Sequence, residues 1–388
     1  MIRHPKFGFY QYDGQMYFDK LDVLDIALSK RDYNPSIHFN FNDEVFLKAD
    51  WETDPPVSLN DVYKMRAQQL RDEYDYLVLM YSGGSDSRQV LHSFIDNDIF
   101  LDEVQTIHPK KLTSSYKVNP NPDEDFAYLS EFYLTTMPGL ENLHKRSPKT
   151  KIEIIDMSDA VLNHRKNETF FTDRSHQSQY GVYHNIKTGV CYNYNNKNSE
   201  GKGKVCLIYG ADKPKIVARN NKLFCYFTDN GRTGINNQRA LNDTNFDVAM
   251  FFDTPDLPLL RIKQCHVVKN FIEQSRAAYE QFTSFRFEKL GLTKTTEFVK
   301  RIVYPSWNDN IFQENKLTNL YSWNAEKALL DKLDPTLGDM VTYRQQSLKN
   351  KYSKFNIDFK HIWLMSIHRP LVPFSMKEGG LIQDFLLN

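Results

Sequence analysis

The sequence predicts an α/β protein built on a parallel, doubly wound sheet. From residue 76 onward, short apolar runs alternate with helical patterns, which is typical of parallel strands joined by helices. The first apolar run, residues 76–81, ends abruptly in a turn rich in serine and glycine, after which an amphipathic helical pattern begins. Because ligands bind at the carboxyl ends of the strands in such sheets, we expect the functional site beside this turn.

Residues 1–75 are expected to form an N-terminal α+β region. Residues 7–20 predict two aromatic-rich strands around Asp13-Gly14, a dipeptide that favours a tight hairpin turn. Ser58 is expected to cap a helix, because its hydroxyl can accept a hydrogen bond from the first free backbone N–H groups. The elements predicted after the hairpin are a helix at 21–30, a strand at 36–48 and the capped helix at 59–73.

Residues 76–216 are predicted to be the ligand-binding α/β domain, and residues 217–388 a mostly helical C-terminal domain. The polar residues 165–203 show little periodicity and are expected to form a mobile lid or a substrate loop, with a disordered segment as the alternative. Strands are predicted at 77–81, 103–107, 151–156 and 205–209, and helices at 87–97 and 122–136, with a short one near Ser158. In the C-terminal part, helices are predicted at 262–290, 295–303, 324–333, 337–349 and 359–367.

The turn after the first strand has the composition of a phosphate-binding loop. Its residues are Ser82, Gly83, Gly84, Ser85, Asp86 and Ser87. The two glycines let the backbone approach an anion closely, and the free N–H groups at the start of the following helix point at it. The serine hydroxyls add donors, and the Asp86 carboxylate offers a ligand for a metal ion carried by the phosphates. This turn differs from the ordinary nucleotide P-loop, whose motif includes a phosphate-binding lysine.

A second buried strand, predicted at 205–209, ends in Gly210, Ala211 and Asp212. Two strands of one sheet that end in such turns are expected to bring Asp86 and Asp212 together at one sheet edge. Two carboxylates beside a phosphate loop predict a Mg²⁺ site, since magnesium binds one or two carboxylates together with phosphate oxygens. The alternative role of Asp212 is to cap the segment that follows it.

The Ser-Gly-Gly-x-Asp-Ser order of the turn resembles the signature of the PP-loop ATP pyrophosphatases. Residues 204–212, which read Lys-Val-Cys-Leu-Ile-Tyr-Gly-Ala-Asp, resemble a stretch in the synthetase domain of asparagine synthetases. The layout also resembles that of phage-encoded PP-loop proteins. This resemblance implies a fold like that of the adenine nucleotide alpha hydrolases, ATP bound by residues 82–87 and Gly210, and Mg²⁺ held by Asp86 and Asp212.

The same resemblance implies a reaction, in which ATP is cleaved to AMP and pyrophosphate while a carboxylate or carbonyl oxygen is adenylated. An amine or ammonia then forms an amide. Lys377, in a Lys-Glu-Gly stretch, resembles the family's lysine that neutralises charge during adenylation; the alternative is a turn lysine exposed to solvent. Lys213 stands where that family has a glutamate, so the substrate contacts are expected to differ. No cysteine precedes Cys191, so we expect no glutaminase domain that would supply ammonia.

Two other functions stay open. One is an enzyme that modifies nucleic acid, either tRNA or the bases of phage DNA, and the other is a non-catalytic nucleotide-binding protein. The intact turn and Asp212 favour an enzyme over the second alternative. Lys+Arg and Asp+Glu number 49 each, and this formal net charge of zero gives no global electrostatic support to a nucleic-acid partner. Small-molecule carboxylates and amines are therefore the substrates expected besides ATP.

Cysteine usage and hydropathy indicate the compartment. The four cysteines show neither a C-x-x-C motif nor a spacing suited to zinc. No apolar run approaches the roughly 20 residues that a membrane span needs, and no charged-then-apolar leader opens the sequence. We therefore expect a protein of the cytoplasm, or of the host cytoplasm if phage-encoded, with free thiols and no membrane contact.

Overall fold

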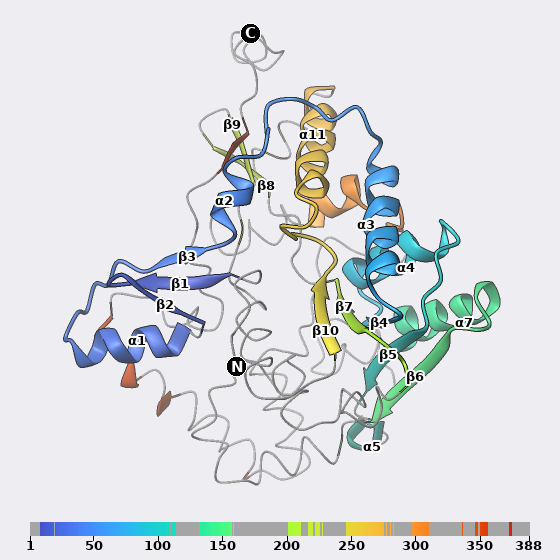
Figure 1. Ribbon diagram of the computed structural model, residues 1–388, viewed down its shortest axis with the longest axis horizontal. Coiled ribbons are helices and arrows are strands. Elements are labelled where there is room, and N and C mark those ends of the chain that lie inside the picture. Colours follow the sequence, from blue (N-terminus) through green and yellow to red (C-terminus); the bar gives the residue numbers. More distant parts are fainter. Residues whose placement is uncertain are drawn as a thin grey trace.

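The computed structural model describes about half of the chain. The described residues are 8–18, 20–108, 110–113, 132–156, 158, 201–210, 216–219, 222–225, 227, 246–274, 277, 280, 282, 297–309, 336, 346–347, 350–355 and 372–374. Figure 1 shows the N-terminal strands and α1 on one side of the molecule and a larger, parallel sheet with its helices on the other. None of the helices in these residues is long and apolar enough to cross a membrane.

The larger sheet has five parallel strands and confirms the predicted α/β class. Its order is β10-β7-β4-β5-β6. The chain therefore runs from the middle strand to one edge and then returns to the other side of the middle strand. The strands are β4 (Tyr76–Met80), β5 (Glu103–His108), β6 (Lys151–Asp156), β7 (Val205–Tyr209) and β10 (Phe246–Met250). Four of them match the predicted strands to within one residue at either end. For β4 and β7 the reason is a continuous apolar run, which marks a strand buried on both faces.

Long helices pack together beside this sheet, as Figure 1 shows for α3 (Leu59–Glu73), α4 (Ser85–Ile95) and α11 (Leu259–Glu273). The prediction that Ser58 caps α3 is confirmed, because its hydroxyl accepts a hydrogen bond from the Asp61 backbone N–H at 3.1 Å. Residues 297–303 are also helical, as predicted. The remaining helices here are α5 (Lys110–Thr113), the π-helix η2 (Phe132–Thr136) and α7 (Met137–Arg146).

The N-terminal region holds a second sheet of three strands with the order β2-β1-β3. The predicted hairpin is confirmed, since Asp13 and Gly14 between its strands have φ values of 49° and 71°, both left-handed. Its elements are β1 (Phe9–Tyr12), β2 (Gln15–Tyr17), α1 (Lys20–Ser29), β3 (His38–Asn40) and α2 (Asp43–Phe46). A third sheet contains β8 (Ile216–Arg219), β9 (Lys222–Cys225) and β11 (Val372–Phe374) in the order β11-β9-β8.

The predicted strand at 36–48 is wrong over most of its length. Only β3 is extended, and the chain then turns at Asn42, whose φ is 54°. The Asp43 carboxylate accepts a hydrogen bond from the Phe41 backbone N–H at 3.0 Å, which stabilises this turn and starts α2. A side chain that bonds its neighbouring backbone in this way competes with the ladder of a sheet.

The structure also contains elements that the sequence analysis did not predict, among them α7, β10 and the strands of the third sheet, which lie in a region expected to be mostly helical. Three basic residues end α7, where they complement the partial negative charge of the helix C-terminus. β10 pairs with β7 from Val205 to Tyr209, so the parallel sheet takes a strand from beyond residue 216. The division into three domains stays a prediction. The predicted helices at 324–333 and 359–367, and most of the helix at 122–136 and of the loop at 165–203, lie outside the described residues.

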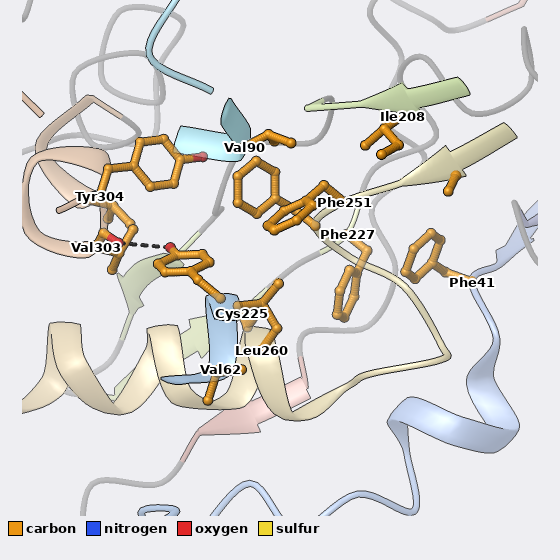
Figure 2. Close-up of a cluster of buried hydrophobic side chains, with 14 of the residues drawn as sticks. Phe41, Val62, Val90, Ile208, Cys225, Phe227, Phe251, Leu260, Val303 and Tyr304 are labelled. Atoms are coloured by element: carbon orange, nitrogen blue, oxygen red, sulfur yellow. Dashed lines mark hydrogen bonds between the residues drawn. The ribbon is translucent and has the colours of Figure 1, made fainter. Parts of the chain in front are cut away.

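A continuous apolar core joins the helices to the sheet. Figure 2 shows part of this core, where Val90 of α4, Leu260 of α11 and Phe251, which follows β10, lie in one cluster with Val303 and Tyr304. The Tyr63 hydroxyl donates a hydrogen bond to the Val303 carbonyl oxygen at 2.8 Å, drawn as a dashed line in Figure 2. The helix at 297–303 is thereby fixed against α3. The cysteines of the described residues, Cys206, Cys225 and Cys265, are free thiols, as expected.

Candidate phosphate-binding site

The predicted phosphate loop connects β4 directly to α4. Gly83 has a φ of 79°, a left-handed value that only glycine adopts without strain. Even without that strain, a Cβ at this position would overlap the backbone of Thr136 at the end of η2. The Thr136 hydroxyl donates to the Ser82 carbonyl oxygen at 2.8 Å, so η2 holds the turn from one side. Glycine is therefore required at position 83 by conformation and by space.

The serines of the turn bond to the turn itself. The Ser87 hydroxyl donates to the Gly84 carbonyl oxygen at 3.1 Å and accepts from the Ser82 backbone N–H at 3.2 Å. The Gly84 backbone N–H donates to the Ser82 hydroxyl oxygen at 3.3 Å. These bonds shape the turn just before α4. Gly84, the N-cap residue of α4, has no side chain that could accept from the first backbone N–H groups of the helix. A helix start of this kind favours a bound anion.

The ends of β4 and β7 meet at this turn, as predicted. Leu79 pairs with Ile208 in the parallel ladder, and Gly210 follows β7 immediately. A Cβ on Gly210 would lie 3.0 Å from the Ser87 backbone nitrogen and 3.1 Å from the Asp86 carbonyl oxygen. The strand order reverses between β4 and β7, and the crevice at such a reversal is the usual ligand site of an open parallel sheet.

Asp86 points away from its own helix toward the segment at 297–309. One carboxylate oxygen accepts a hydrogen bond from the Tyr304 hydroxyl at 2.8 Å. The other lies 2.9 Å from the Lys300 ammonium, and the Asp86 side chain is 19% exposed. Asp86 is therefore held by two donors from a helix that is more than 200 residues away in the chain.

Lys300 is a buried cation at this site, with only 3% of its side chain exposed. Its ammonium also donates to the Glu297 carboxylate at 3.1 Å and to the Ser85 hydroxyl oxygen at 3.1 Å. Glu297 is itself 6% exposed. Ionic groups at this depth gain much more from one another than groups at the surface, because little water screens them.

Packing around Tyr304 fixes the approach of this helix to the turn. Its ring stacks on Phe252 with centroids 5.5 Å apart. Burial first, and then the negative charge of Asp86, raise the pKa of Tyr304 well above its usual value, so its hydroxyl stays protonated and donates. Just beyond it, the Ser306 backbone N–H donates to the Gln89 side chain of α4 at 3.1 Å. The helix at 297–303 and α4 are thus joined at two points.

An aromatic pair lies at the end of β5, next to the turn in the strand order. The His108 ring stacks on Phe132 with centroids 3.8 Å apart and planes 10° apart. Burial lowers the pKa of His108 to about 4, with Asp156 opposing this shift. The His108 ring is therefore a neutral, flat surface at neutral pH.

The structure brings together the predicted residues of the turn, Ser82 to Ser87, with Gly210. Asp212 and Lys377 lie outside the described residues, so the predicted pairing of Asp86 with Asp212 and the role of Lys377 stay predictions. Within the part of the chain that the structure describes, no group of three histidine, cysteine or acidic residues is arranged to hold a metal ion. A metal site here would depend on Asp86 together with further ligands.

Sequence reasoning missed Glu297, Lys300 and Tyr304. The helix that carries Glu297 and Lys300 was predicted, and Tyr304 follows its last residue, one turn after Lys300. Two charged residues on the same face as Val303 were the available signal, because such a face is buried only when its charges have partners. Nothing in the sequence indicates that Asp86 is one of those partners.

Comparisons with known proteins do not extend these observations. No protein-family model matches the chain, and no curated protein matches it significantly. The functional argument therefore depends on the geometry of the turn, Gly210 and the buried group of Asp86, Lys300 and Glu297.

Proposed function

We propose that this protein is a PP-loop enzyme with a doubly wound sheet that binds ATP at the turn from Ser82 to Ser87. It cleaves ATP to AMP and pyrophosphate while it adenylates a carboxylate or carbonyl oxygen, and an amine or ammonia then forms an amide, as in asparagine synthetases. One observation carries the proposal. The turn follows a central strand at the reversal of strand order, and Gly210 of the adjacent strand lies against Asp86 and Ser87.

The donor set at the turn suits Mg²⁺ as a partner of the nucleotide. Asp86 offers hard carboxylate oxygens, which magnesium prefers, and its side chain is partly exposed beside the helix start. Asp212, two residues after Gly210 in the sequence, is the second ligand that we propose. A bound Mg²⁺ would neutralise charge on the pyrophosphate that leaves.

The residues of the chain contribute mainly by position and charge. Backbone N–H groups at the start of α4 bind the phosphates, and Gly83 lets the backbone approach them. The substrate oxygen forms a bond to the α-phosphorus as the bond to the β-phosphate oxygen breaks, and pyrophosphate leaves with that electron pair. The amine then bonds to the activated carbon, loses a proton and releases AMP. Holding the reactants in line accounts for most of the rate gain that we propose.

The test is to measure pyrophosphate, orthophosphate, AMP and ADP released from ATP and Mg²⁺. The protein is incubated with pools of amino acids and other carboxylates, each with and without amines, and with pools of tRNA and DNA. Asp86→Asn removes the proposed metal ligand, and Asp96→Asn at the other end of α4 is the matched control, since that side chain bonds to His92 and Arg146. We expect pyrophosphate and AMP that depend on one pool and on Asp86, with Asp96→Asn close to wild type.

The outcomes separate the three functions. Release that requires the small-molecule pools supports the asparagine synthetase-like reaction, whereas release that requires tRNA or DNA identifies a nucleic-acid-modifying enzyme. ADP and orthophosphate as products would contradict PP-loop chemistry. ATP binding without turnover in any pool would favour the non-catalytic nucleotide-binding protein.

A further inference from the structure

Lys300 presents a positive charge to the phosphate-binding turn from a distant part of the chain. Its ammonium lies within hydrogen-bond distance of three oxygen atoms, on Ser85, Asp86 and Glu297. Two of these oxygens belong to the first residues of α4, where the nucleotide phosphates are proposed to bind. A lysine ammonium has three N–H donors and no acceptor, so the oxygens of Ser85, Asp86 and Glu297 take up all three donors of Lys300.

The turn itself provides no positive side chain, because residues 82–87 contain neither lysine nor arginine. The ordinary P-loop includes a lysine that reaches the terminal phosphates. A turn without one offers a highly charged triphosphate only neutral donors, its backbone N–H groups and serine hydroxyls, unless a cation comes from elsewhere in the fold. Lys300 occupies the position from which such a cation would act.

We propose that Lys300 is a nucleotide-binding residue whose ammonium contacts the β- and γ-phosphates of ATP. This inference rests on the proposed function. Without nucleotide, the ammonium is held by Asp86 and Glu297. A divalent cation that bound to Asp86 together with ATP would weaken the ion pair between Asp86 and Lys300. The phosphate oxygens would then replace the Asp86 carboxylate as acceptors of the ammonium N–H groups. The flexible four-carbon stem of lysine permits this short movement.

Glu297 and Tyr304 act as positioning residues in this scheme. Glu297 lies one helical turn before Lys300 and keeps the ammonium at the turn through its bond at 3.1 Å. Tyr304 fixes the carboxylate of Asp86 at 2.8 Å. The proposal therefore distinguishes Lys300, which contacts phosphate, from two neighbours that orient the groups around it.

The test compares the dissociation constants of ATP and AMP, both with Mg²⁺, by isothermal titration calorimetry. Removing Lys300 alone would leave the buried Glu297 and the partly buried Asp86 without their shared cation, so the principal variant is Glu297→Gln with Lys300→Met. This double variant keeps the net charge that the two residues and Asp86 carry together. Arg301→Met is the control, because Arg301 is on the same helix, 48% exposed, and pairs with Asp309.

We expect the double variant to bind ATP about 10- to 100-fold more weakly, the range for loss of a charged hydrogen bond. Its AMP affinity should stay within about twofold of wild type, since AMP lacks the phosphates that Lys300 contacts. Lys300→Arg keeps the positive charge and should bind ATP nearly as tightly as the wild type does. Arg301→Met should bind both nucleotides as the wild type does.

Three results are decisive against the proposal or its basis. If the double variant unfolds at the wild-type denaturant concentration and binds ATP as tightly as wild type, Lys300 contacts no phosphate. If ATP and AMP are weakened equally, Lys300 has only a structural role. If wild-type protein binds neither nucleotide, the proposed function itself fails. Should the double variant not fold, Glu297→Gln with Lys300→Gln takes its place, because it keeps a hydrogen-bond donor for Asp86 but no cation, and unchanged ATP binding by it would again overturn the proposal.

Discussion

Two lysines of this protein each pair with two carboxylates, one at each end of the parallel sheet. Lys151 begins β6 and lies 2.6 Å from Glu153 and 3.3 Å from Glu103. Its side chain is 54% exposed. Water therefore screens the ammonium and its pair with Glu153, and exposed ion pairs of this kind contribute about 0–1 kcal/mol to stability. Glu103 is buried, but it also accepts hydrogen bonds from Tyr76 and Gln105 and so keeps partners without Lys151.

Lys300 at the opposite end has the same set of partner groups but is buried. Its distances to Asp86 and Glu297 are 2.9 and 3.1 Å. Burying the ionised Lys300 and Glu297, and part of Asp86, requires a large desolvation free energy, which the pairing only partly offsets. An apolar side chain would fill the same space without that cost. The role that we propose for Lys300 at the turn from Ser82 to Ser87 would account for this difference.

The largest expected effect separates these two lysines directly. Lys300→Met should lower the free energy of unfolding by about 3–5 kcal/mol, since it leaves the buried Glu297 and the partly buried Asp86 without their cation. Lys151→Met should lower it by less than about 1 kcal/mol. Urea denaturation followed by circular dichroism measures both values. Equal losses in the two variants would show that burial does not distinguish the two groups.

Two glycines allow a second comparison, between the proposed phosphate-binding turn and the turn of the N-terminal hairpin. Gly83 and Gly14 both have left-handed φ values, 79° and 71°. A Cβ on Gly14 meets nothing within 4 Å, whereas a Cβ on Gly83 would overlap Thr136. Gly14→Ala should therefore lower the free energy of unfolding by about 1–2 kcal/mol from backbone strain alone.

Gly83→Ala adds overlap to the same strain and should cost about 2–5 kcal/mol. It should also displace the turn and abolish ATP binding, while Gly14→Ala leaves binding unchanged. Urea denaturation and calorimetric titration of ATP test the two effects separately. Comparable stability losses, or intact ATP binding by Gly83→Ala, would show that Thr136 can move aside.

The parts of the fold that were predictable are those fixed by neighbours in sequence. The hairpin around Asp13-Gly14, the cap of α3 and the turn after β4 each depend on a few consecutive residues. β10 was missed because Asp247 interrupts the apolar run of Phe246–Met250, so it lacks the continuous apolar pattern by which the equally short β4 and β7 were predicted. Its place in the sheet depends on pairing with β7, which no local pattern reveals.

The candidate site likewise has a part that the local sequence predicts and a part that depends on contacts between distant residues. The turn and the approach of Gly210 followed from strand ends that share one sheet edge. The contact of Lys300 and Tyr304 with Asp86 did not, because it joins residues more than 200 positions apart. Whether a polar helix face is buried or exposed depends on the helix it packs against. That information lies in α3 and α11, which hold the helix at 297–303 through Tyr63 and Gln264.

The smallest expected effect concerns the pKa values of two histidines, His108 and His92, which have different neighbours. Burial lowers the pKa of His108 from 6.5 to about 4. Burial also lowers the pKa of His92, but its hydrogen bond to Asp96 at 2.9 Å opposes that shift. An unfolded histidine binds a proton near pH 6.5, so between that pH and about 4 the unfolded chain takes up more protons at position 108 than the folded one. Stability from neutral His108 is therefore fully present above pH 6.5 and is lost as the pH falls toward 4.

The measurement is the free energy of unfolding in urea at pH 7, 6, 5 and 4.5 for wild type, His108→Gln and His92→Gln. His108→Gln should lose about 2 kcal/mol less than wild type over this range, after allowance for partial solvent screening. His92→Gln should follow the wild-type slope more closely, because Asp96 stabilises the protonated ring. Parallel slopes for wild type and His108→Gln would mean that the His108 ring, stacked on Phe132, accepts a proton in the folded protein as readily as in the unfolded chain.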